Sequence, residues 1–428
     1  MMNDEWNFDL HEIISDIAMA SDLSDSLEIY KNNISRLKGY KFIFANANLK
    51  GFATGISIDK DFPSGGVVRS LYGHEKVFVL DEITFEEMAE NKSAQFAIDY
   101  SISLDTQALS YLKPFIYTPK SNQLHDKIRE VFDFISQEHV WIDSSPYDLE
   151  NYFNLLDPKN HEKIFNKVRA YEFLRNLDVK KYNLTKDISC HLSDVELIKT
   201  TQEHLAHKFH GLEDSRVVEG LKRRFNLVYA LLLIIAIVQL GHKRASLFEK
   251  MKLYFEYNDR FLAAISLRES ILAREFFVKQ QNLLFFSKVQ INKKEIFSEL
   301  RNMTWDVLHF RQLEESATFK FNKEARYFFP AILTFDQRFI EVIDLFKLKS
   351  LVYNDKNNIF PFYLRSIDDF DGLSLDEKEF LKQNFFSELA KISRLMRLED
   401  AKNKLADSVS YLETQLSEIA GVTIDYLI

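Results

Sequence analysis

The chain has 428 residues, of which 46% are hydrophobic and 14% aromatic, and its 64 acidic and 55 basic residues give a net charge of −9. This length suffices for two or three domains, or for one domain with a large insertion. The negative charge argues against a surface that coats nucleic acid along its whole length, but not against local basic patches. The single cysteine, Cys190, excludes a disulfide framework and a multi-cysteine zinc site, and it fits a reducing cytoplasm.

The N-terminal residues, Met1 to Trp6, are acidic where a signal peptide would be basic, so we expect a cytoplasmic protein. One apolar block, residues 225–240, invites comparison with a membrane segment. It is shorter than the roughly 20 residues needed to span a bilayer, and it contains Asn226 and Gln239. We therefore expect a buried core helix here and no membrane contact.

Residue spacing predicts helices at both ends of the chain and mixed structure between them. A helical stretch over 1–38 gives way to short strands at 41–45, 55–58 and 76–80. Residues 113–120 read as a break with two prolines. Taken in order, the chain predicts an N-terminal mixed α/β region (1–90), an α/β core (91–112 and 256–355), a helical insertion within it (113–255) and a C-terminal helical region (356–428).

The second part of the predicted core has regular elements of both kinds. Helices are expected over 258–280 and 293–315. A strand over 327–333, a helix over 337–346 and a strand at 350–353 then follow one another. This strand–helix–strand order favours a parallel sheet.

The C-terminal region carries an apolar stripe at helical spacing. Such a stripe packs a helix on its own domain, and the alternative is a homodimer or a regulatory partner bound through these helices. The stripe consists of Leu389, Ile392, Met396, Leu405, Val409, Leu412, Leu416 and Ile419.

Residues 97–112 contain the first candidate site residue. β-Branched residues form a strand pattern that ends at Leu104, and helical spacing begins after Asp105 and Thr106. Open α/β sheets place their sites where a strand ends and a helix begins, so Asp105 is a candidate. The alternative is that Asp105 or Thr106 caps the helix.

Three later acids also need an explanation. Glu269 falls on the apolar stripe of the expected helix, where a carboxylate is costly unless it is paired or binds a metal. Asp306 lies among aromatic and apolar residues, and Asp336 follows a strand that ends at Thr334. The alternatives are an ion pair for Glu269 and helix caps for the two aspartates.

These acids resemble, in order and setting, those of the PIN-like nucleases. The family has an Asp at the end of the first core strand, a Glu on a later helix, an Asp near a helix start and a final Asp after a strand that contains Thr. The matching residues are Asp105 in Leu-Asp-Thr-Gln-Ala-Leu, Glu269, Asp306, and Asp336 in Leu-Thr-Phe-Asp-Gln-Arg-Phe. The resemblance covers residues 97–112 and 258–353. It implies an α/β fold with a PIN-like parallel-sheet core, a large mainly helical insertion and a helical C-terminal tail.

The same resemblance implies a function. Asp105, Glu269, Asp306 and Asp336 would be catalytic metal ligands, and a set of oxygen ligands favours Mg²⁺ or Mn²⁺. The activity would be metal-dependent hydrolysis of phosphodiester bonds, with RNA as the expected substrate and single-stranded DNA as the alternative. A toxin or antiviral defence role suits such a nuclease. The competing hypothesis is a non-catalytic helical binding or regulatory protein with a degenerate nuclease core.

The sequence departs from the family pattern in two places. The interval between Asp105 and Glu269 is much longer than in small members, which requires an insertion. Gln107 stands where an Asn is common. Two basic clusters, residues 222–224 and 243–244, are candidates for phosphate contacts, and solvated helix ends are the alternative.

A histidine triplet, His204, His207 and His210, has the appearance of a metal cluster. Neighbouring members lie roughly 60° apart around a helix and the outer two roughly 120° apart. Only neighbouring pairs could share a ligand sphere, whereas a zinc site needs three or four ligands. We therefore do not expect a metal site there.

Overall fold

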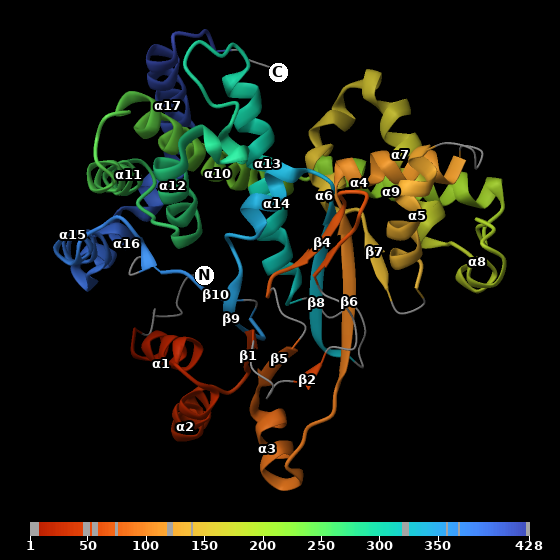
Figure 1. Cartoon of the computed structure of the whole chain (residues 1–428), viewed down its shortest axis with the longest axis horizontal. Coiled ribbons are helices and arrows are strands. Elements are labelled where there is room, and N and C mark those ends of the chain that lie inside the picture. The colour runs from red at the N-terminus through yellow and green to blue at the C-terminus, as the bar shows by residue number, and fades with distance from the viewer. Residues whose placement is uncertain are drawn as a thin grey trace. The chain divides into compact units, whose positions relative to one another are not determined.

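The computed structural model describes residues 8–45, 52–53, 59–72, 76–117, 123–137, 140–318, 325–356, 358–366 and 369–424. Within these residues the protein is mixed α/β, with two five-stranded sheets (Figure 1). The chain forms two compact units. The first comprises residues 1–205, 311–336 and 346–364, and the second comprises 206–310, 337–345 and 365–428.

One sheet of the first unit is antiparallel throughout, in the order β10-β9-β1-β5-β2. Its strands are β1 (Tyr40–Ala45), β2 (Phe52–Ala53), β5 (Lys76–Leu80), β9 (Leu348–Asn354) and β10 (Ile359–Tyr363). Helices α1 (Phe8–Met19) and α2 (Leu23–Asn33) pack an apolar core against it, and α3 (Glu82–Asn91) follows β5. The predicted strands at 41–45 and 76–80 are confirmed, and residues 55–58 lie outside the described residues.

The other sheet has the order β3-β4-β8-β6-β7. Its strands are β3 (Lys60–Asp61), β4 (Val67–Ser70), β6 (Ala97–Leu104), β7 (Trp141–Asp143) and β8 (Ala325–Thr334). Strand β6 pairs in parallel with both β7 and β8, and Leu104 lies opposite Leu333. The carboxyl ends of these three strands therefore share one edge of the sheet. The strand predicted at 97–104 and the presence of parallel strand pairs are confirmed, whereas the pairing of β6 with β7 and β8 is not among the predictions.

Helices gather at this edge (Figure 1). They are α4 (Thr106–Tyr117), α5 (Gln123–Ile135), α6 (Ser145–Glu150), α7 (His161–Arg175), α8 (Val179–Thr185) and α9 (Asp194–Glu213). The predicted break at 113–120 is wrong in its first half, because α4 runs through Pro114 to Tyr117. Burial of Leu112 and Phe115 on either side of the proline offsets the backbone hydrogen bond that it loses.

The second unit is helical. Its helices are α10 (Ser215–Gly241), α11 (Leu247–Phe261), α12 (Leu267–Lys279), α14 (Gln337–Ile343), α15 (Leu375–Leu381), α16 (Glu388–Asn403) and α17 (Leu405–Ala420), and α13 (Ile296–Ser316) passes from this unit into the first. Residues 228–240 of α10 are buried, as the sequence predicts for a core helix. By length and composition α10 would also pass as a membrane span, but 72% of its most apolar window is covered within the structure, as in core helices of soluble proteins.

Two predicted connections are wrong. The single helix expected over 258–280 is split into α11 and α12, because Ala263 adopts a left-handed φ of +46° that an α-helix cannot continue. Strands β8 and β9 lie in different sheets, although the strand–helix–strand order suggested one. Both edges of β8 are already occupied by β4 and β6, so β9 pairs with β1 and β10 instead.

The C-terminal apolar stripe does not form one face. Helix α16 ends at Asn403, and α17 packs its apolar side on α10, which buries Leu412 and Leu416. The α16 part of the stripe is exposed, with Leu389 and Met396 each 81% accessible. The helix is interrupted at Lys404 between the two halves, so a common spacing does not place them on a common surface.

Two glycines with different surroundings test the packing. A Cβ at Gly66 would lie 2.6 Å from the ring of Phe335, whereas a Cβ at Gly220, inside α10, meets nothing within 4 Å. We expect Gly66→Ala to lower the free energy of unfolding by about 1–3 kcal/mol through overpacking. Gly220→Ala should raise it by up to about 1 kcal/mol, because alanine favours a helix interior. Chemical denaturation followed by circular dichroism measures both, and a destabilised Gly220→Ala would contradict the helix assignment.

Candidate functional site

The carboxyl end of β6 carries a polar face. Ser101, Ser103 and Asp105 alternate with buried Ile102 and Leu104, so they lie on one side of the strand. Both serine hydroxyls donate to one oxygen of the Asp143 carboxylate, at 2.9 and 2.8 Å, across the parallel pair β6–β7. The strand ends thereby bring two aspartates to the same edge.

Asp105 is buried, with 7% of its surface accessible. One carboxylate oxygen accepts the backbone N–H of Ala108 at 2.5 Å, which caps the start of α4. Burial raises the pKa of Asp105 to about 7 against the lowering effect of hydrogen bonds from Thr334 and Ala108, and the charges of Glu150 and Asp336 raise the pKa further. The alternative that Asp105 caps a helix is confirmed, and the same carboxyl has a pKa raised toward neutral by burial.

Thr334, at the end of β8, connects Asp105 with Asp336. Its buried hydroxyl donates to the Asp105 carboxylate and accepts the backbone N–H of Asp336 at 3.1 Å. The half-buried Asp336 lies close enough to Asp105 for its charge to raise the pKa of that carboxyl. The structure thus brings together the first and the last of the four acids that the sequence singled out.

Glu150 and Lys167 complete this cluster. The Glu150 carboxylate, at the end of α6, accepts the hydroxyl of Thr106, and burial raises its pKa. Lys167 of α7 contacts the Ser110 hydroxyl at 2.7 Å, and its Nζ lies 5.3 Å from the centre of the Tyr147 ring. Burial lowers the pKa of Lys167, with Lys163 also lowering it. We call Asp105, Glu150, Lys167 and Asp336 the strand-end cluster.

The other two predicted acids lie in the second unit, whereas the strand-end cluster lies in the first. Glu269 is fully buried in the first turn of α12, as predicted for its stripe, and it accepts the hydroxyl of Ser266. Asp306 is half-buried in the middle of α13, which confirms the helix predicted over 293–315, and the alternative that Asp306 caps a helix start is wrong. The Thr304 hydroxyl donates to the Leu300 carbonyl at 2.8 Å inside this helix, so Thr304 does not cap a helix start either.

Sequence reasoning missed Asp143, Glu150 and Lys167. A signal was present for the first two, since the Ile142-Asp143 strand end is followed by Ser-Ser-Pro and a short helix. This repeats the strand–acid–helix pattern of Asp105. These residues fall in the predicted helical insertion, and a three-residue strand is too short to show a period of two.

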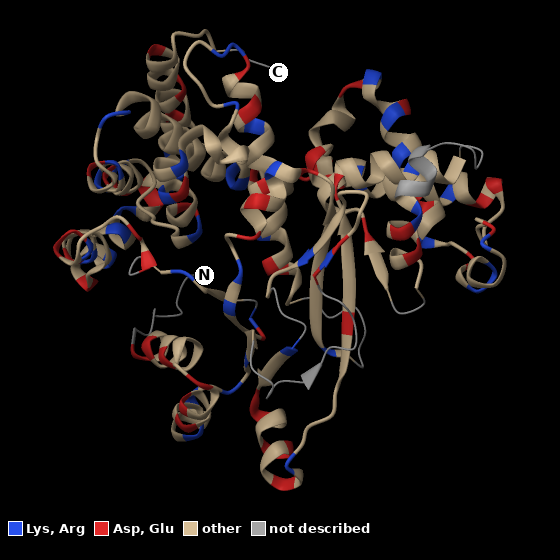
Figure 2. Ribbon diagram, in the orientation of Figure 1, with Lys and Arg blue, Asp and Glu red and all other residues tan. Residues whose placement is uncertain are grey.

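The two basic clusters do not form one patch. Residues 222–224 lie inside α10 and residues 243–244 follow its end, so about 30 Å of helix separates them. Lys222, Arg223, Lys243 and Arg244 are exposed. Figure 2 shows acidic and basic residues interspersed along the helices, which suits a chain without a general nucleic-acid coat.

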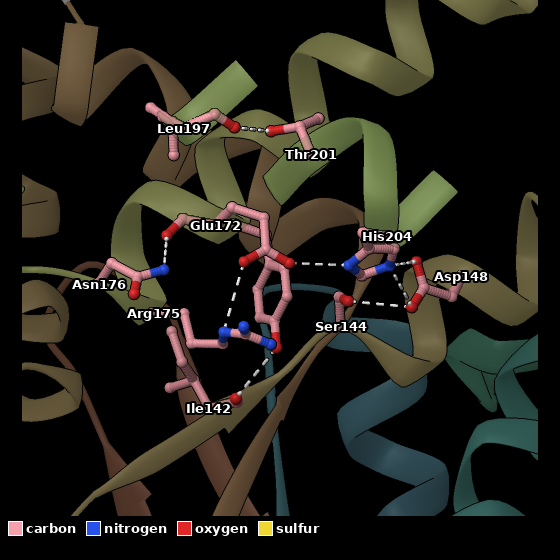
Figure 3. Close-up of polar contacts among 10 residues, drawn as sticks. Ile142, Ser144, Asp148, Glu172, Arg175, Asn176, Leu197, Thr201 and His204 are labelled. Carbon is pink, nitrogen blue, oxygen red and sulfur yellow. Dashed lines mark hydrogen bonds and ion pairs between the residues drawn. The ribbon is translucent and has the colours of Figure 1, made fainter. Parts of the chain in front are cut away.

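A second polar group adjoins the strand-end cluster through the same two helices. The ring of His204, on α9, lies between Glu172 of α7 and Asp148 of α6 (Figure 3). Its Nδ1 is 2.8 Å from Glu172, and its Nε2 is 3.2 and 3.3 Å from the two oxygens of Asp148. Arg175 pairs with the other Glu172 oxygen at 3.3 Å. We call these residues the His204 clamp.

The three histidines do not point to a common centre. Only His204 is directed into the protein, and its two nitrogens face different carboxylates. His207 and His210 are exposed on the same helix. Across the described residues, no group of three or more His, Cys, Asp or Glu side chains surrounds a point that would hold a metal ion.

No family model, curated protein or solved structure matches this chain. The geometry of the site therefore carries the functional interpretation by itself. Asp105, Glu150 and Lys167 have displaced pKa values and lie where parallel strands end, as is typical of functional sites in α/β proteins.

The pKa of Asp105 predicts a pH dependence of stability. An aspartate in the unfolded chain ionises near pH 4, whereas Asp105 has a pKa of about 7 when folded. The folded protein therefore binds the extra proton between roughly pH 4 and 7, and stability falls as pH rises through this window, by up to about 4 kcal/mol.

The variant Asp105→Asn keeps an acceptor for the Ala108 N–H and removes the titration. We expect its free energy of unfolding to decline less than that of the wild type between pH 4.5 and 7.5. Urea titrations at several pH values measure the difference. Parallel curves for the two proteins would show that Asp105 ionises normally in the folded state.

Proposed function

We propose that this protein is a metal-dependent nuclease whose reaction takes place at the strand-end cluster. The observation that carries the proposal is the convergence of three acids: Asp105 after the end of β6, Asp336 after the end of β8, and Glu150 at the end of α6. The negative charges of Glu150 and Asp336 each disfavour ionisation of the buried Asp105 carboxyl. A divalent cation relieves such repulsion, because it favours the charged form of every carboxylate around it.

The donor chemistry fits Mg²⁺ or Mn²⁺. All three acids offer oxygen, the atom that these hard cations prefer. Mg²⁺ commonly binds through one or two carboxylates and completes its shell with water and substrate phosphate. The lack of a group of three ligands around one point within the described residues is compatible with such an open site. Asp105 and Asp336 would hold the ion, with Glu150 beside them.

When bound, the cation would supply an activated water and charge stabilisation at the phosphodiester. The surrounding side chains position the acids and offer a cation to the substrate. Thr334 fixes the Asp105 carboxylate, and Thr106 fixes Glu150. Lys167 is half-buried beside Tyr147, where its cation is available for a phosphate. We propose RNA as the substrate, with single-stranded DNA as the alternative.

Cleavage of labelled RNA and single-stranded DNA tests this proposal. We expect the purified protein to cut with Mn²⁺ or Mg²⁺ and not with EDTA. Asp105→Asn and Asp336→Asn should each lower the rate by about 100-fold or more, because several kcal/mol of charge stabilisation are lost. Asp99→Asn is the matched control, since Asp99 lies on β6 away from its carboxyl end. Metal-independent cutting, or cutting that survives both variants, would refute the assignment.

Glu269→Gln and Asp306→Asn test the set of four acids that the PIN-like resemblance implies. These residues belong to the second unit, so a site built from the first unit alone predicts that both variants cleave at nearly the wild-type rate. Glu150→Gln should reduce the rate. The reverse pattern would favour the set inferred from the PIN-like resemblance over the strand-end cluster.

A second function has a specific observation in its favour. The carboxylate of Asp105 is already used as a helix cap, and Thr106 already bonds to Glu150, as in a purely structural arrangement. We therefore keep a non-catalytic binding or regulatory protein as the alternative. Mn²⁺ distinguishes the two: a nuclease should gain thermal stability from Mn²⁺ at pH 7.5, and Asp105→Asn should abolish the gain.

A further inference from the structure

The His204 clamp and the strand-end cluster are built on the same two helices. Helix α6 carries Asp148 in the clamp and Glu150 in the cluster, two residues apart. Helix α7 carries Lys167 in the cluster and Glu172 in the clamp, about 7.5 Å further along the helix axis. A displacement of α6 or α7 at the clamp therefore also displaces Glu150 or Lys167.

The charges in the clamp balance only when the imidazole is a cation. Ionised carboxylates accept hydrogen bonds and cannot donate, so a ring between two of them must donate from both nitrogens. With both carboxylates ionised, His204 is an imidazolium, and its charge together with that of Arg175 balances Asp148 and Glu172. Glu172 has 1% and His204 13% of its side chain accessible, so little water is available to replace this pairing.

The clamp is also geometrically specific. The Ser144 hydroxyl donates to Asp148 at 3.0 Å, which fixes that carboxylate at the start of α6. The ring of Tyr171, on α7, packs edge-on against the imidazole, with centroids 5.8 Å apart. Tyr171 in turn donates to the Ile142 carbonyl of β7 at 3.4 Å. The imidazole thus joins α6, α7 and α9 next to a strand of the parallel sheet.

We propose that His204 is a positioning residue of the strand-end cluster, which as an imidazolium holds α6 and α7 at the separation that places Glu150 and Lys167 beside Asp105. The role of Glu150 and Lys167 in a reaction rests on the proposed function, whereas the mechanical link does not. The positive charge of His204 is what holds the two helices, because a neutral ring can donate to only one of the two carboxylates.

Hydrogen exchange of the full-length protein tests the link without any cleavage assay. In His204→Gln, the backbone amides of α6 and α7 should exchange at least about tenfold faster than in the wild type. His207→Gln is the matched control, because His207 is exposed one turn further along α9 and should leave exchange unchanged. Equal exchange in His204→Gln and the wild type would overturn the proposal.

A charge rescue separates positioning from simple packing. His204→Lys restores a cation with three donors, and we expect it to recover the exchange rates of α6 and α7 to within about threefold of the wild type. Asp148→Asn, a variant of nearly the same shape, should loosen α6 in the direction of His204→Gln. If His204→Lys is no better than His204→Gln, the shape of the ring and not its charge supports the helices, and the proposal fails.

Kinetics distinguish failure of this proposal from failure of the proposed function. With an active nuclease, His204→Gln should lower kcat by about tenfold or more with a smaller change in KM, since the substrate surface remains while the acids shift. An unchanged kcat would overturn the positioning role even if Asp105→Asn is inactive. If the wild type cuts nothing but exchange still depends on the charge at position 204, the nuclease proposal fails and the mechanical link stands.

Discussion

The parallel pairing of β6 with β7 and β8 is the constraint on which the first unit depends. Parallel strands end at the same edge, so the residues that follow Leu104, Ile142 and Leu333 are brought together whatever their distance in the chain. Buried apolar residues on β6 and β8 hold this register. A slip of one residue would turn Ser101, Ser103 and Asp105 to the opposite face.

The same strand pairing gathers acidic side chains in the strand-end cluster, where their negative charges repel one another. The fold buries Asp105 and surrounds it with other acids, and it offers Lys167 and two threonine hydroxyls as partial compensation. Structural acids are ordinarily paired with a nearby cation, as Arg326 pairs with Glu87 in the same unit. A carboxyl that keeps its proton near neutral pH costs stability, and such costs are usually found where a protein binds or reacts.

The His204 clamp shows the opposite solution to the same problem. Buried Glu172 pairs with His204 and Arg175. Half-buried Asp148 pairs with His204, so the clamp contributes order to the helices. The clamp and the cluster share α6 and α7. Ion pairs hold these helices at the clamp, whereas like charges repel one another at the cluster. This combination is suited to a preorganised site.

The sequence by itself determined the local elements and much of their burial. The strand before Asp105, the helix after it, the buried run in α10 and the buried position of Glu269 all follow from residue spacing, because side-chain periodicity depends on neighbours along the chain. Asp105 and Asp336 were found for the same reason, since each follows a strand that can be recognised from its own residues.

Only the tertiary structure decided which acids meet. Whether β9 joins β8 or β1 depends on which strand edges are free, and that is not encoded in any short segment. The left-handed Ala263 divided a predicted helix, and Glu269 and Asp306 belong to a different unit from Asp105. Glu150, Lys167 and the partners of His204 emerged from helix packing, because contacts between α6, α7 and α9 join residues that spacing along the chain cannot relate.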